Sequence, residues 1–294
     1  MIVGLNAITT DLVLLSIIIP TRNRYAMLSR CLATLRPQAQ GLGAEVYEII
    51  VSDDSPGDEQ KGKLAVDFPN VHWNRGPQQG PAANRNNGAK VAKGDWLIFV
   101  DDDCIPEPTL LTAYIKAISE NPDFFVFEGA ILPKGPQMRM DDEAPLNEGG
   151  GRLWSCNFMI RRELFVKLNG FCELFPYAAL EDVDLRERLK IGGYPFMFVS
   201  KAGVVHPWRL LDSAGKHFKT QLISHRIFYA RYPELRISAV RMIYGLIRTS
   251  FSEFFTLGPR VYFRGFGRWF VRKWTNGLLV LVLATKPAEP PPTR

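Results

Sequence analysis

Three consecutive aspartates that directly follow a strongly apolar run constrain this chain more than any other feature. The run Trp96–Val100 reads WLIFV, a composition typical of a strand buried on both faces, and Asp101, Asp102 and Asp103 end it. Adjacent carboxylates repel one another, so a stable fold keeps them exposed or places a cation beside them. A solvated acidic turn is the simpler interpretation. The position at the end of a buried strand favours the other, a site for Mg²⁺ or Mn²⁺, which prefer oxygen ligands.

Two further apolar runs, at residues 12–19 and 45–52, predict strands of the same buried kind. Helical spacing or helix-forming composition occupies four other segments, at residues 23–35, 58–68, 80–91 and 110–118. This alternation is typical of an α/β domain built on a mostly parallel, doubly wound sheet, whose ligands bind beyond the carboxyl ends of the strands. The polar clusters of the chain follow those ends, which predicts one site along one edge of the sheet.

Composition excludes several other classes of protein. Hydrophobic residues make up 46% of the 294 residues and charged residues 22%, so the chain is not disordered as a whole. The four cysteines lie far apart without a CxxC pair, which excludes a disulfide framework and a structural zinc site and favours a reduced compartment. No secretory signal and no run long enough to span a bilayer is apparent, so we expect a cytoplasmic protein.

Carboxylates at two other places are candidates for the site. Asp53 and Asp54 end the second predicted strand, where they could accept hydrogen bonds from a ribose or a base, or simply form a turn. Glu181 and Asp182 open a helix predicted at residues 181–190. Capping by the helix dipole explains them structurally, and a general base on a rigid helix explains them functionally. The next acidic residue of that helix is expected to point away, toward solvent or a neighbouring arginine.

Two basic side chains also precede or follow predicted elements. Arg85 lies in the small-residue segment GPAANRNNGA, at an expected helix start where a guanidinium could approach a phosphate; an exposed helical arginine is the alternative. His206 follows a stretch predicted as a strand at residues 195–200 and its continuation, and taken alone it is interpreted as the polar end of that strand.

Seven segments in fixed order resemble the family-2 inverting glycosyltransferases with the GT-A fold. They are SIIIPTRNR, EIIVSDDSPGD, GPAANRNNGA, GDWLIFVDDDCIPEPTLL, CNFMIRRELFVKLNGF, LEDVDLRERLKIGG and VVHPW. The similarity covers residues 14–208. Each segment alone is a weak signal, whereas seven in order are a strong one. The motif usually written GGFDE departs here, because Cys172 stands where aspartate is expected.

The resemblance implies how the donor would be bound. Pro20, Thr21 and Arg22 would contact the nucleotide sugar, Asp54 would bind the base, and Arg85 would support the nucleotide. The donor would be a nucleotide diphosphate sugar, by default a UDP-sugar.

The resemblance also implies the reacting groups. Asp101 would belong to the nucleotide-sugar site, Asp102 would reach the ribose or the sugar, and Asp103 would hold Mn²⁺ or Mg²⁺ together with His206. Asp182 would deprotonate the acceptor hydroxyl. Three further residues would lie on the acceptor side: Glu181, Trp154 and Asn157.

The C-terminal part of the chain differs in charge from the rest. Residues 231–286 contain ten Lys or Arg and two Glu, a net charge of +8, which leaves −2 for the remainder of a chain of +6. Arg260, Arg264, Arg268 and Arg272 recur every fourth residue among aromatics, which predicts one basic helix face lying on an anionic membrane surface. Helices packed on the domain with their arginines in solvent are the alternative. Nucleic acid is not expected as a partner.

Together these features predict three regions. Residues 12–210 would form the catalytic domain, with a nucleotide-binding half at 12–105 and an acceptor half at 106–210. Residues 211–286 would form a helical, membrane-associating appendage, and residues 287–294 a disordered tail. We expect a metal-dependent inverting transferase that glycosylates a hydroxyl of a glycan or lipid-linked acceptor, peripheral on the inner face of the membrane. A non-catalytic nucleotide-sugar-binding protein and a nucleotidyltransferase are the alternatives.

Overall fold

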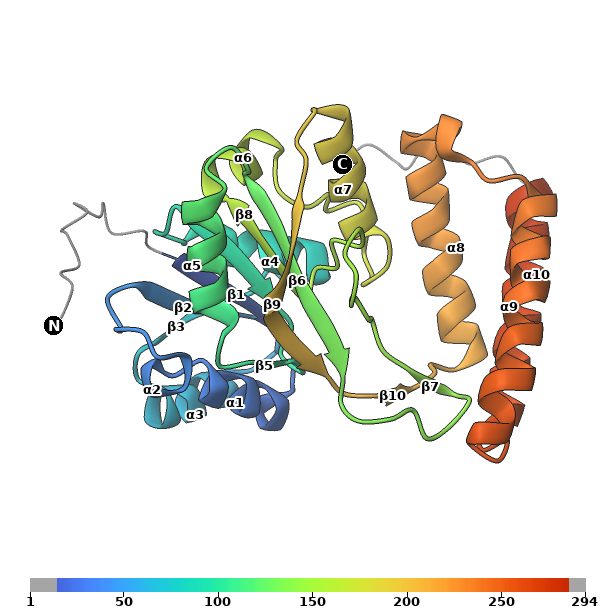
Figure 1. Ribbon diagram of the computed structural model, residues 1–294, viewed down its shortest axis with the longest axis horizontal. Helices are drawn as coiled ribbons and strands as arrows, with labels where there is room; N and C mark the ends of the chain where they lie inside the picture. Colours follow the sequence, from blue (N-terminus) through green and yellow to red (C-terminus); the bar gives the residue numbers. More distant parts are fainter. Residues whose placement is uncertain (1–14, 286–294) are drawn as a thin grey trace, which may run out of the picture.

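The computed structural model describes residues 15–285, which form a mixed α/β domain with a layer of long helices beside it (Figure 1). Eight strands form one sheet in the order β3-β2-β1-β4-β8-β6-β9-β5. Their bounds are β1 Leu15–Thr21, β2 Tyr47–Asp53, β3 Val71–Arg75, β4 Trp96–Val100, β5 Ile105–Pro106, β6 Val126–Pro133, β8 Asn157–Arg161 and β9 Met197–His206. The predicted α/β class is confirmed. The predicted strand at 12–19 and the tail at 287–294 lie partly or wholly outside the described residues.

The first half of the sheet is parallel, as the alternation of strands and helices predicts. β1 pairs in parallel with β2 and β4, and β2 pairs in parallel with β3. Four helices accompany these strands: α1 Tyr25–Thr34, α2 Pro37–Gln40, α3 Glu59–Asp67 and α4 Pro81–Lys90. α4 packs closely on β1, because a Cβ at Gly88 would lie 2.7 Å from Cγ2 of Ile18. The glycine in that segment therefore serves close helix–sheet packing.

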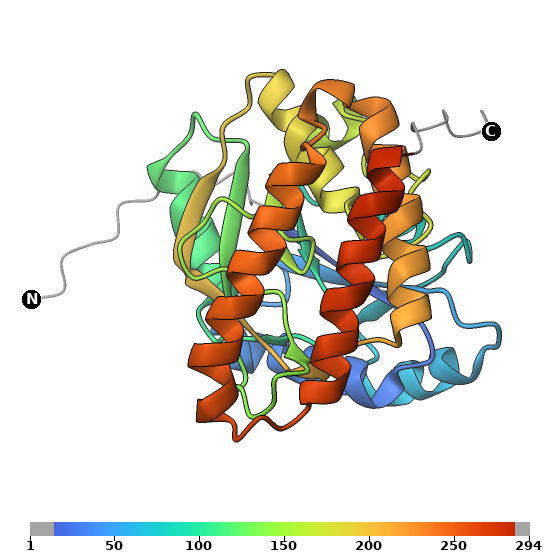
Figure 2. The ribbon, with the colours of Figure 1, turned by 90° about the vertical axis from the view of Figure 1, so that its right-hand side faces the viewer.

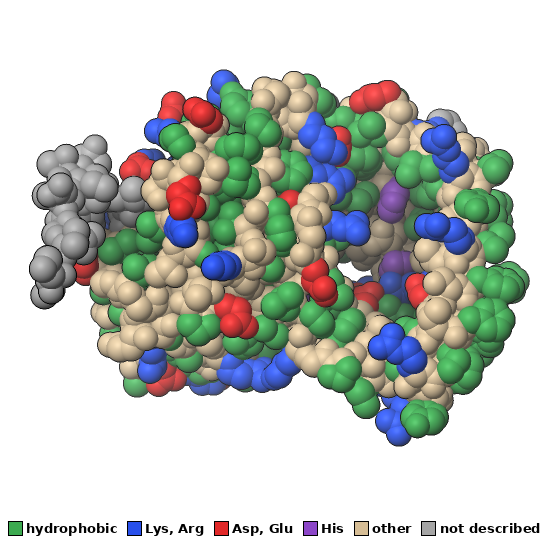
Figure 3. Space-filling view, in the orientation of Figure 1, with side chains coloured by type: hydrophobic (Ala, Val, Ile, Leu, Met, Phe, Trp, Pro, Cys, Tyr) green, Lys and Arg blue, Asp and Glu red, His purple; other side chains and the backbone are tan. Residues whose placement is uncertain are grey.

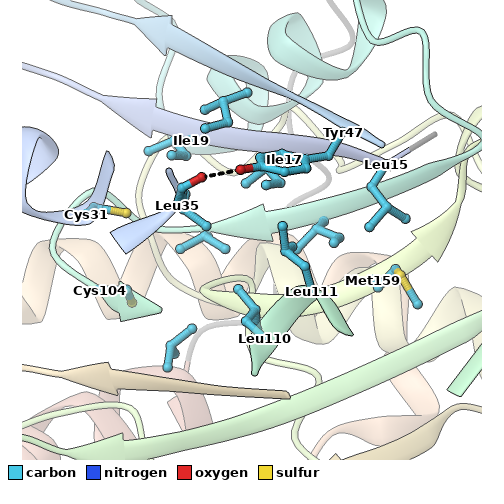
Figure 4. Close-up of a cluster of buried hydrophobic side chains, with 14 of the residues drawn as sticks. Leu15, Ile17, Ile19, Cys31, Leu35, Tyr47, Cys104, Leu110, Leu111 and Met159 are labelled. Atoms are coloured by element: carbon cyan, nitrogen blue, oxygen red, sulfur yellow. Dashed lines mark hydrogen bonds between the residues drawn. The ribbon is translucent and has the colours of Figure 1, made fainter. Parts of the chain in front are cut away.

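The core on one face of the sheet is one continuous cluster of buried hydrophobic side chains. Leu15, Ile17 and Ile19 of β1 are fully buried in it, together with Leu35 and many other side chains (Figure 4). The hydroxyl of Tyr47 donates a hydrogen bond to the carbonyl oxygen of Leu35 at 2.6 Å, so the polar atom of this buried ring is satisfied.

Antiparallel strands enter the sheet in its second half. β8 pairs antiparallel with both β4 and β6, β6 pairs in parallel with β9, and β5 pairs antiparallel with the end of β9. Three helices lie along this part, α5 Leu110–Glu120, α6 Arg162–Lys167 and α7 Glu181–Ile191. A short two-stranded ribbon, β7 Asp142–Glu143 with β10 Arg209–Leu210, follows the ends of β6 and β9. β10 of this ribbon leads the chain from β9 to the C-terminal helices.

Three long helices, α8 Ala214–Arg231, α9 Ala239–Arg260 and α10 Phe266–Thr285, stand side by side beside the domain (Figures 1 and 2). α10 packs against both α8 and α9. α9 extends through Pro259 to Arg260. Proline in the last turn costs the helix one backbone hydrogen bond, which a long helix tolerates. None of the helices in residues 15–285 is both long and apolar enough to span a bilayer.

The prediction that four arginines form one helix face is wrong. Arg260 ends α9, Arg264 lies in the turn after it, and Arg268 and Arg272 belong to α10. A turn at residues 261–265 separates the two helices; Gly265 has a φ of +79° there. A Cβ at Gly265 would lie 1.8 Å from Oδ1 of Asp141, so the turn packs closely on the domain. A spacing of four residues places side chains on one face only within a single continuous helix, and here the helix is interrupted.

Candidate active site

The polar clusters at the ends of β1, β2 and β4 come together, as the parallel arrangement predicts. The hydroxyl of Thr21 donates to Oδ2 of Asp102 at 2.7 Å, and the amide of Asp54 donates to the carbonyl oxygen of Thr21 at 2.9 Å. Pro20 is half-buried beside them, and Arg22 is exposed. Burial raises the pKa of Asp102 to about 6.

Arg24 is a residue of this site that the sequence interpretation missed. Its Nη1 lies 3.1 Å from Oδ1 of Asp102 and 3.5 Å from Oδ2 of Asp103. Asn23 has a φ of +54°, so the chain turns sharply between β1 and α1 and brings Arg24 back toward the aspartates. The segment PTRNR contains two arginines, and spacing alone could not tell which of them reaches the aspartates.

Asp53 and Asp54 have different roles. Asp53 is fully buried and accepts hydrogen bonds from Ser55, Gln60 and Trp73, which makes it part of the scaffold. Asp54 accepts from the amide of Gln78 at 2.9 Å, and burial raises its pKa, opposed by that bond and by the charge of Arg22. Asp54 is thus the member of the pair with capacity left for a ligand.

Gly76 makes room beside Asp54. A Cβ there would lie 2.1 Å from Oδ1 of Asp54 and 2.6 Å from Oδ1 of Asn84, so only glycine fits without displacing either side chain. The sequence interpretation did not identify this glycine. A lone glycine after a short strand gives no signal of what approaches it.

Asp103 and His206 meet at the ends of β4 and β9. Nε2 of His206 lies 3.5 Å from Oδ1 of Asp103, and both side chains are largely buried. Nδ1 of His206 lies 2.8 Å from the carbonyl oxygen of Pro207, which can only accept, so Nδ1 donates and Nε2 is the nitrogen whose lone pair a neutral ring offers to a metal. The carboxylate oxygen suits both Mn²⁺ and Mg²⁺, whereas the imidazole nitrogen suits Mn²⁺ better than the harder Mg²⁺, so these residues fit a divalent metal and favour Mn²⁺.

Cys104 completes a group of three possible ligands. One donor atom from each of Asp103, Cys104 and His206 lies within 4.8 Å of the others. Cys104 was not among the predicted ligands. Its Sγ also lies 3.9 Å from the carbonyl oxygen of Cys156, so the thiol already has a partner within the core.

Arg85 connects two elements instead of presenting its charge to solvent. It is 3% exposed and lies within α4; Nη2 is 2.7 Å from Oδ1 of Asp101, and Nη1 is 3.0 Å from Oε1 of Glu181. Burial alone would raise the pKa of Asp101, but the charge and hydrogen bond of Arg85 lower it below its usual value. A contact of Arg85 with the nucleotide, as predicted, would require it to leave these partners.

Glu181 and Asp182 open α7 as predicted, after Leu180 in a left-handed conformation with a φ of +70°. Burial, reinforced by the charge of Asp182, raises the pKa of Glu181 to about 8. Burial also raises the pKa of Asp182, against the opposing charge of Arg85. Glu181 is 2% exposed and Asp182 is 7% exposed, so Asp182 is the more accessible of the two.

Asp184 does not point to solvent. It is fully buried, with Oδ2 2.8 Å from Nε of Arg188 and Oδ1 2.6 Å from Nε of Arg231. The hydroxyl of Tyr232 donates to Oδ1 at 3.0 Å. Arg188 is the arginine partner within α7 that the sequence predicted, whereas the contacts with Arg231 and Tyr232 at the end of α8 were not predicted. Asp184 therefore fixes α8 to the helix that carries Asp182.

The two residues predicted on the acceptor side have structural partners. Asn157 is fully buried; its amide nitrogen donates to the carbonyl oxygens of Ala130 and Ala202, both at 2.8 Å, and Oδ1 accepts from Tyr114. A side chain so enclosed joins neighbouring strands, and its predicted contact with an acceptor is not compatible with this placement. Trp154 is half-buried, and its Nε1 donates to the carbonyl oxygen of Leu146 at 3.3 Å.

The fold and these strand-end carboxylates define a GT-A domain. The model of glycosyl transferase family 2 matches residues 16–168, which is more than half of the chain, and the chain belongs to that family. An uncharacterized glycosyltransferase of Haemophilus influenzae is 30% identical over 190 residues, which cover 60% of this chain and 62% of that protein. A GalNAc(5)-diNAcBac-PP-undecaprenol beta-1,3-glucosyltransferase of Campylobacter jejuni is 36% identical over 94 residues, 30% of this chain and 29% of that protein. The chain thus spans less than two thirds of the length of these curated relatives.

Solved structures share the fold at low sequence identity. The crystal structure of S. aureus TarS 1-349 in complex with UDP-GlcNAc has a TM-score of 0.51 at 19% identity and covers 71% of this chain and 65% of its own. GalNAc-T7 with UDP, GalNAc and Mn²⁺ has a TM-score of 0.57 at 18% identity and covers 76% and 51%. These neighbours confirm the GT-A fold, and their bound molecules belong to those proteins.

Proposed function

We propose that this protein is an inverting, divalent-metal-dependent glycosyltransferase that uses a nucleotide diphosphate sugar. The observation that carries the proposal is the bridge from Asp101 through Arg85 to Glu181. The bridge joins the aspartate triplet to the start of α7, so Asp182 lies on the helix held against the donor edge of the sheet. Family membership favours this reading over a nucleotidyltransferase.

The donor would lie along the ends of β1, β2 and β4. Asp54 would bind the nucleotide base. The amide of Gln78 holds its carboxylate, and Gly76 leaves space beside it. Thr21 orients Asp102 for the ribose or the sugar through its 2.7 Å hydrogen bond. UDP is the default nucleotide, because two structural neighbours were solved with UDP or a UDP-sugar.

Asp103 and His206 would hold the metal. When bound, Mn²⁺ or Mg²⁺ would supply positive charge to the diphosphate leaving group. Arg24, 3.5 Å from Asp103 and half exposed, adds a fixed positive charge of the chain at the same place. The proton on Nδ1 of His206 keeps Nε2 available as a ligand.

Asp182 would act as the general base. It would take the proton from the acceptor hydroxyl as that oxygen attacks the anomeric carbon, and the bond to the diphosphate oxygen would break from the opposite side. A single displacement of this kind inverts the anomeric centre. Glu181, whose pKa burial raises to about 8, would remain protonated near neutral pH and help to place the acceptor.

The acceptor would be a glycan or a lipid-linked molecule, and the enzyme would work peripherally on the cytoplasmic face of a membrane with an anionic surface. The name of the C. jejuni relative includes a molecule linked to undecaprenol, which supports a lipid-linked acceptor. The positive charge of residues 231–286 supports an anionic membrane surface.

A panel of nucleotide sugars tests the proposal. We expect Mn²⁺-dependent hydrolysis of at least one UDP-sugar by the wild-type protein, and loss of that hydrolysis in Asp182→Asn with UDP binding retained. Binding of UDP-sugars without any hydrolysis or transfer would support the non-catalytic alternative. Absence of binding to every nucleotide sugar in the panel would overturn the proposal.

A further inference from the structure

The outward side of the α9–α10 pair is an exposed apolar surface that the catalytic proposal does not use. We call it the outer face and define it by ten residues that are each at least 37% exposed: Val240, Tyr244, Ile247, Phe251, Phe255, Phe266, Phe270, Trp274, Leu278 and Leu281. Within each helix these residues recur every three or four positions, which places them in one stripe along each helix. Single exposed apolar residues are ordinary, but two adjacent stripes of them mark an interaction surface.

A groove of about 740 Å³ lies between the two helices. Aromatic side chains form much of its wall, among them Phe251, Phe254, Phe270 and Trp274, while Ser250 and Gly277 leave space. Lys273 also lines the groove, but its charge is paired, because Nζ of Lys273 lies 2.8 Å from Oε2 of Glu253. The groove therefore suits a hydrocarbon chain and not a polar ligand.

The opposite side of the pair is firmly attached to the protein. Leu279 and Leu283 of α10 are buried in a cluster with side chains of α8, and Val261 and Trp269 are buried against Met140. The buried Arg272 lies 3.6 Å from Glu143 and contacts His217, so it stabilises the attachment and does not face outward. The outer face is consequently held in a fixed orientation relative to the catalytic domain.

Unpaired positive charge surrounds the outer face. Five exposed arginines of these helices and their turn have no ion-pair partner within residues 15–285: Arg241, Arg248, Arg260, Arg264 and Arg268. The two acidic residues of this region are Glu234, outside both helices, and Glu253, which is paired with Lys273. Figure 3 shows hydrophobic and basic side chains together along the edge formed by α9 and α10. This chemistry complements anionic lipid, whose headgroups meet arginines while its chains meet the apolar stripes.

We propose that the outer face inserts into one leaflet of an anionic membrane, with lipid hydrocarbon occupying the groove between α9 and α10. The attachment is a hairpin lying in the membrane surface, held mainly by aromatic insertion and secondarily by the arginines around it. This inference deepens the proposed function and rests on it for the acceptor, because a fixed outer face would hold the active site at a constant distance from a membrane-bound acceptor.

Flotation with phosphatidylcholine–phosphatidylglycerol vesicles tests the inference on the full chain. We expect the wild-type protein to float with vesicles and to remain largely bound in high salt, since apolar insertion is not screened. Phe251→Ser/Phe270→Ser/Trp274→Ser should weaken vesicle binding by at least about tenfold at any salt concentration. At low phosphatidylglycerol content, Arg260→Gln/Arg264→Gln/Arg268→Gln should bind vesicles nearly as well as the wild type. Its binding should not increase as the phosphatidylglycerol content is raised.

Binding of UDP by all variants serves as the control for folding, because none of the substituted residues belongs to the proposed donor site. Failure of the wild type to float, with UDP binding intact, would overturn the docking inference and leave the transferase proposal unaffected. A wild-type dimer in light scattering that the aromatic variant converts to a monomer would instead assign the outer face to a second copy of the chain. Loss of UDP-sugar turnover with vesicle binding intact would contradict only the transferase proposal.

Discussion

Nη1 of Arg85 lies 3.0 Å from Oε1 of Glu181, and both side chains are 3% exposed. These residues are 96 positions apart in the chain. Because the same guanidinium also pairs with Asp101, its single positive charge serves two carboxylates. Glu181 and Asp182 share this buried region, and burial, only partly opposed by the charge of Arg85, raises the pKa of each. One of them can hold a proton while the other acts as a base.

The division of roles between these carboxylates predicts unequal effects of isosteric substitutions. Asp182→Asn should reduce sugar transfer by at least about 10²-fold, the usual contribution of a general base, with UDP binding unchanged. Glu181→Gln should be much milder, because a neutral amide resembles the protonated carboxyl that burial favours. Initial rates together with calorimetric titration of UDP measure both effects. A larger loss of transfer in Glu181→Gln than in Asp182→Asn would show that Asp182 is not the general base.

The raised pKa of Glu181 also predicts a dependence of stability on pH. Its pKa is about 8 in the folded protein and about 4.5 in the unfolded chain, so between these values the folded state binds the additional proton. The free energy of unfolding should therefore fall as the pH rises from about 4.5 to 8, by an amount that Glu181→Gln removes. Urea unfolding of both proteins across this window provides the comparison. Parallel curves for the two proteins would show that Glu181 does not hold the proton.

The contacts of Asp184 predict that it is needed to hold α8 against α7. Asp184→Asn should lower the free energy of unfolding by about 3 kcal/mol, because it leaves Arg231 and Arg188 without their fully buried partner. Arg186→Gln, on the same helix, is a matched control. Nε of Arg186 lies 3.4 Å from Oε1 of the adjacent Glu187 in a partly exposed pair. The substitution should therefore lower the free energy of unfolding by less than about 1 kcal/mol. Equal stability of the two variants would mean that α8 is not held through Asp184.

Local patterns predicted the first half of the fold well, for identifiable reasons. The apolar run Trp96–Val100 forms a fully buried strand, as its composition indicates, and the polar ends of such strands meet because β1, β2 and β4 are adjacent and parallel. Thr21 and Asp102 consequently form the predicted edge cluster. His206 and Asp103 meet because β9 and β4 end at the same edge, which only the family resemblance indicated.

The remaining errors come from contacts between residues that are distant in sequence. Arg85 was predicted to contact the nucleotide, with an exposed helix residue as the alternative, because nothing local shows that its partners Asp101 and Glu181 lie on other elements. Asn157 looked available to an acceptor because nothing local shows that its strand is inserted between β4 and β6. The arginine spacing was misleading because it crosses the turn at residues 261–265, where Gly265 packs against Asp141.

The most direct test of a metal-dependent donor site at Asp103 is calorimetric titration of UDP with Mn²⁺ and then with EDTA. We predict that the wild-type protein binds UDP at least about tenfold more tightly with Mn²⁺. Asp103→Ala should lose this difference while its thermal unfolding midpoint stays close to that of the wild type. Equal UDP affinity of the wild type with Mn²⁺ and with EDTA, or an undiminished Mn²⁺ effect in Asp103→Ala, would contradict the metal-dependent mechanism.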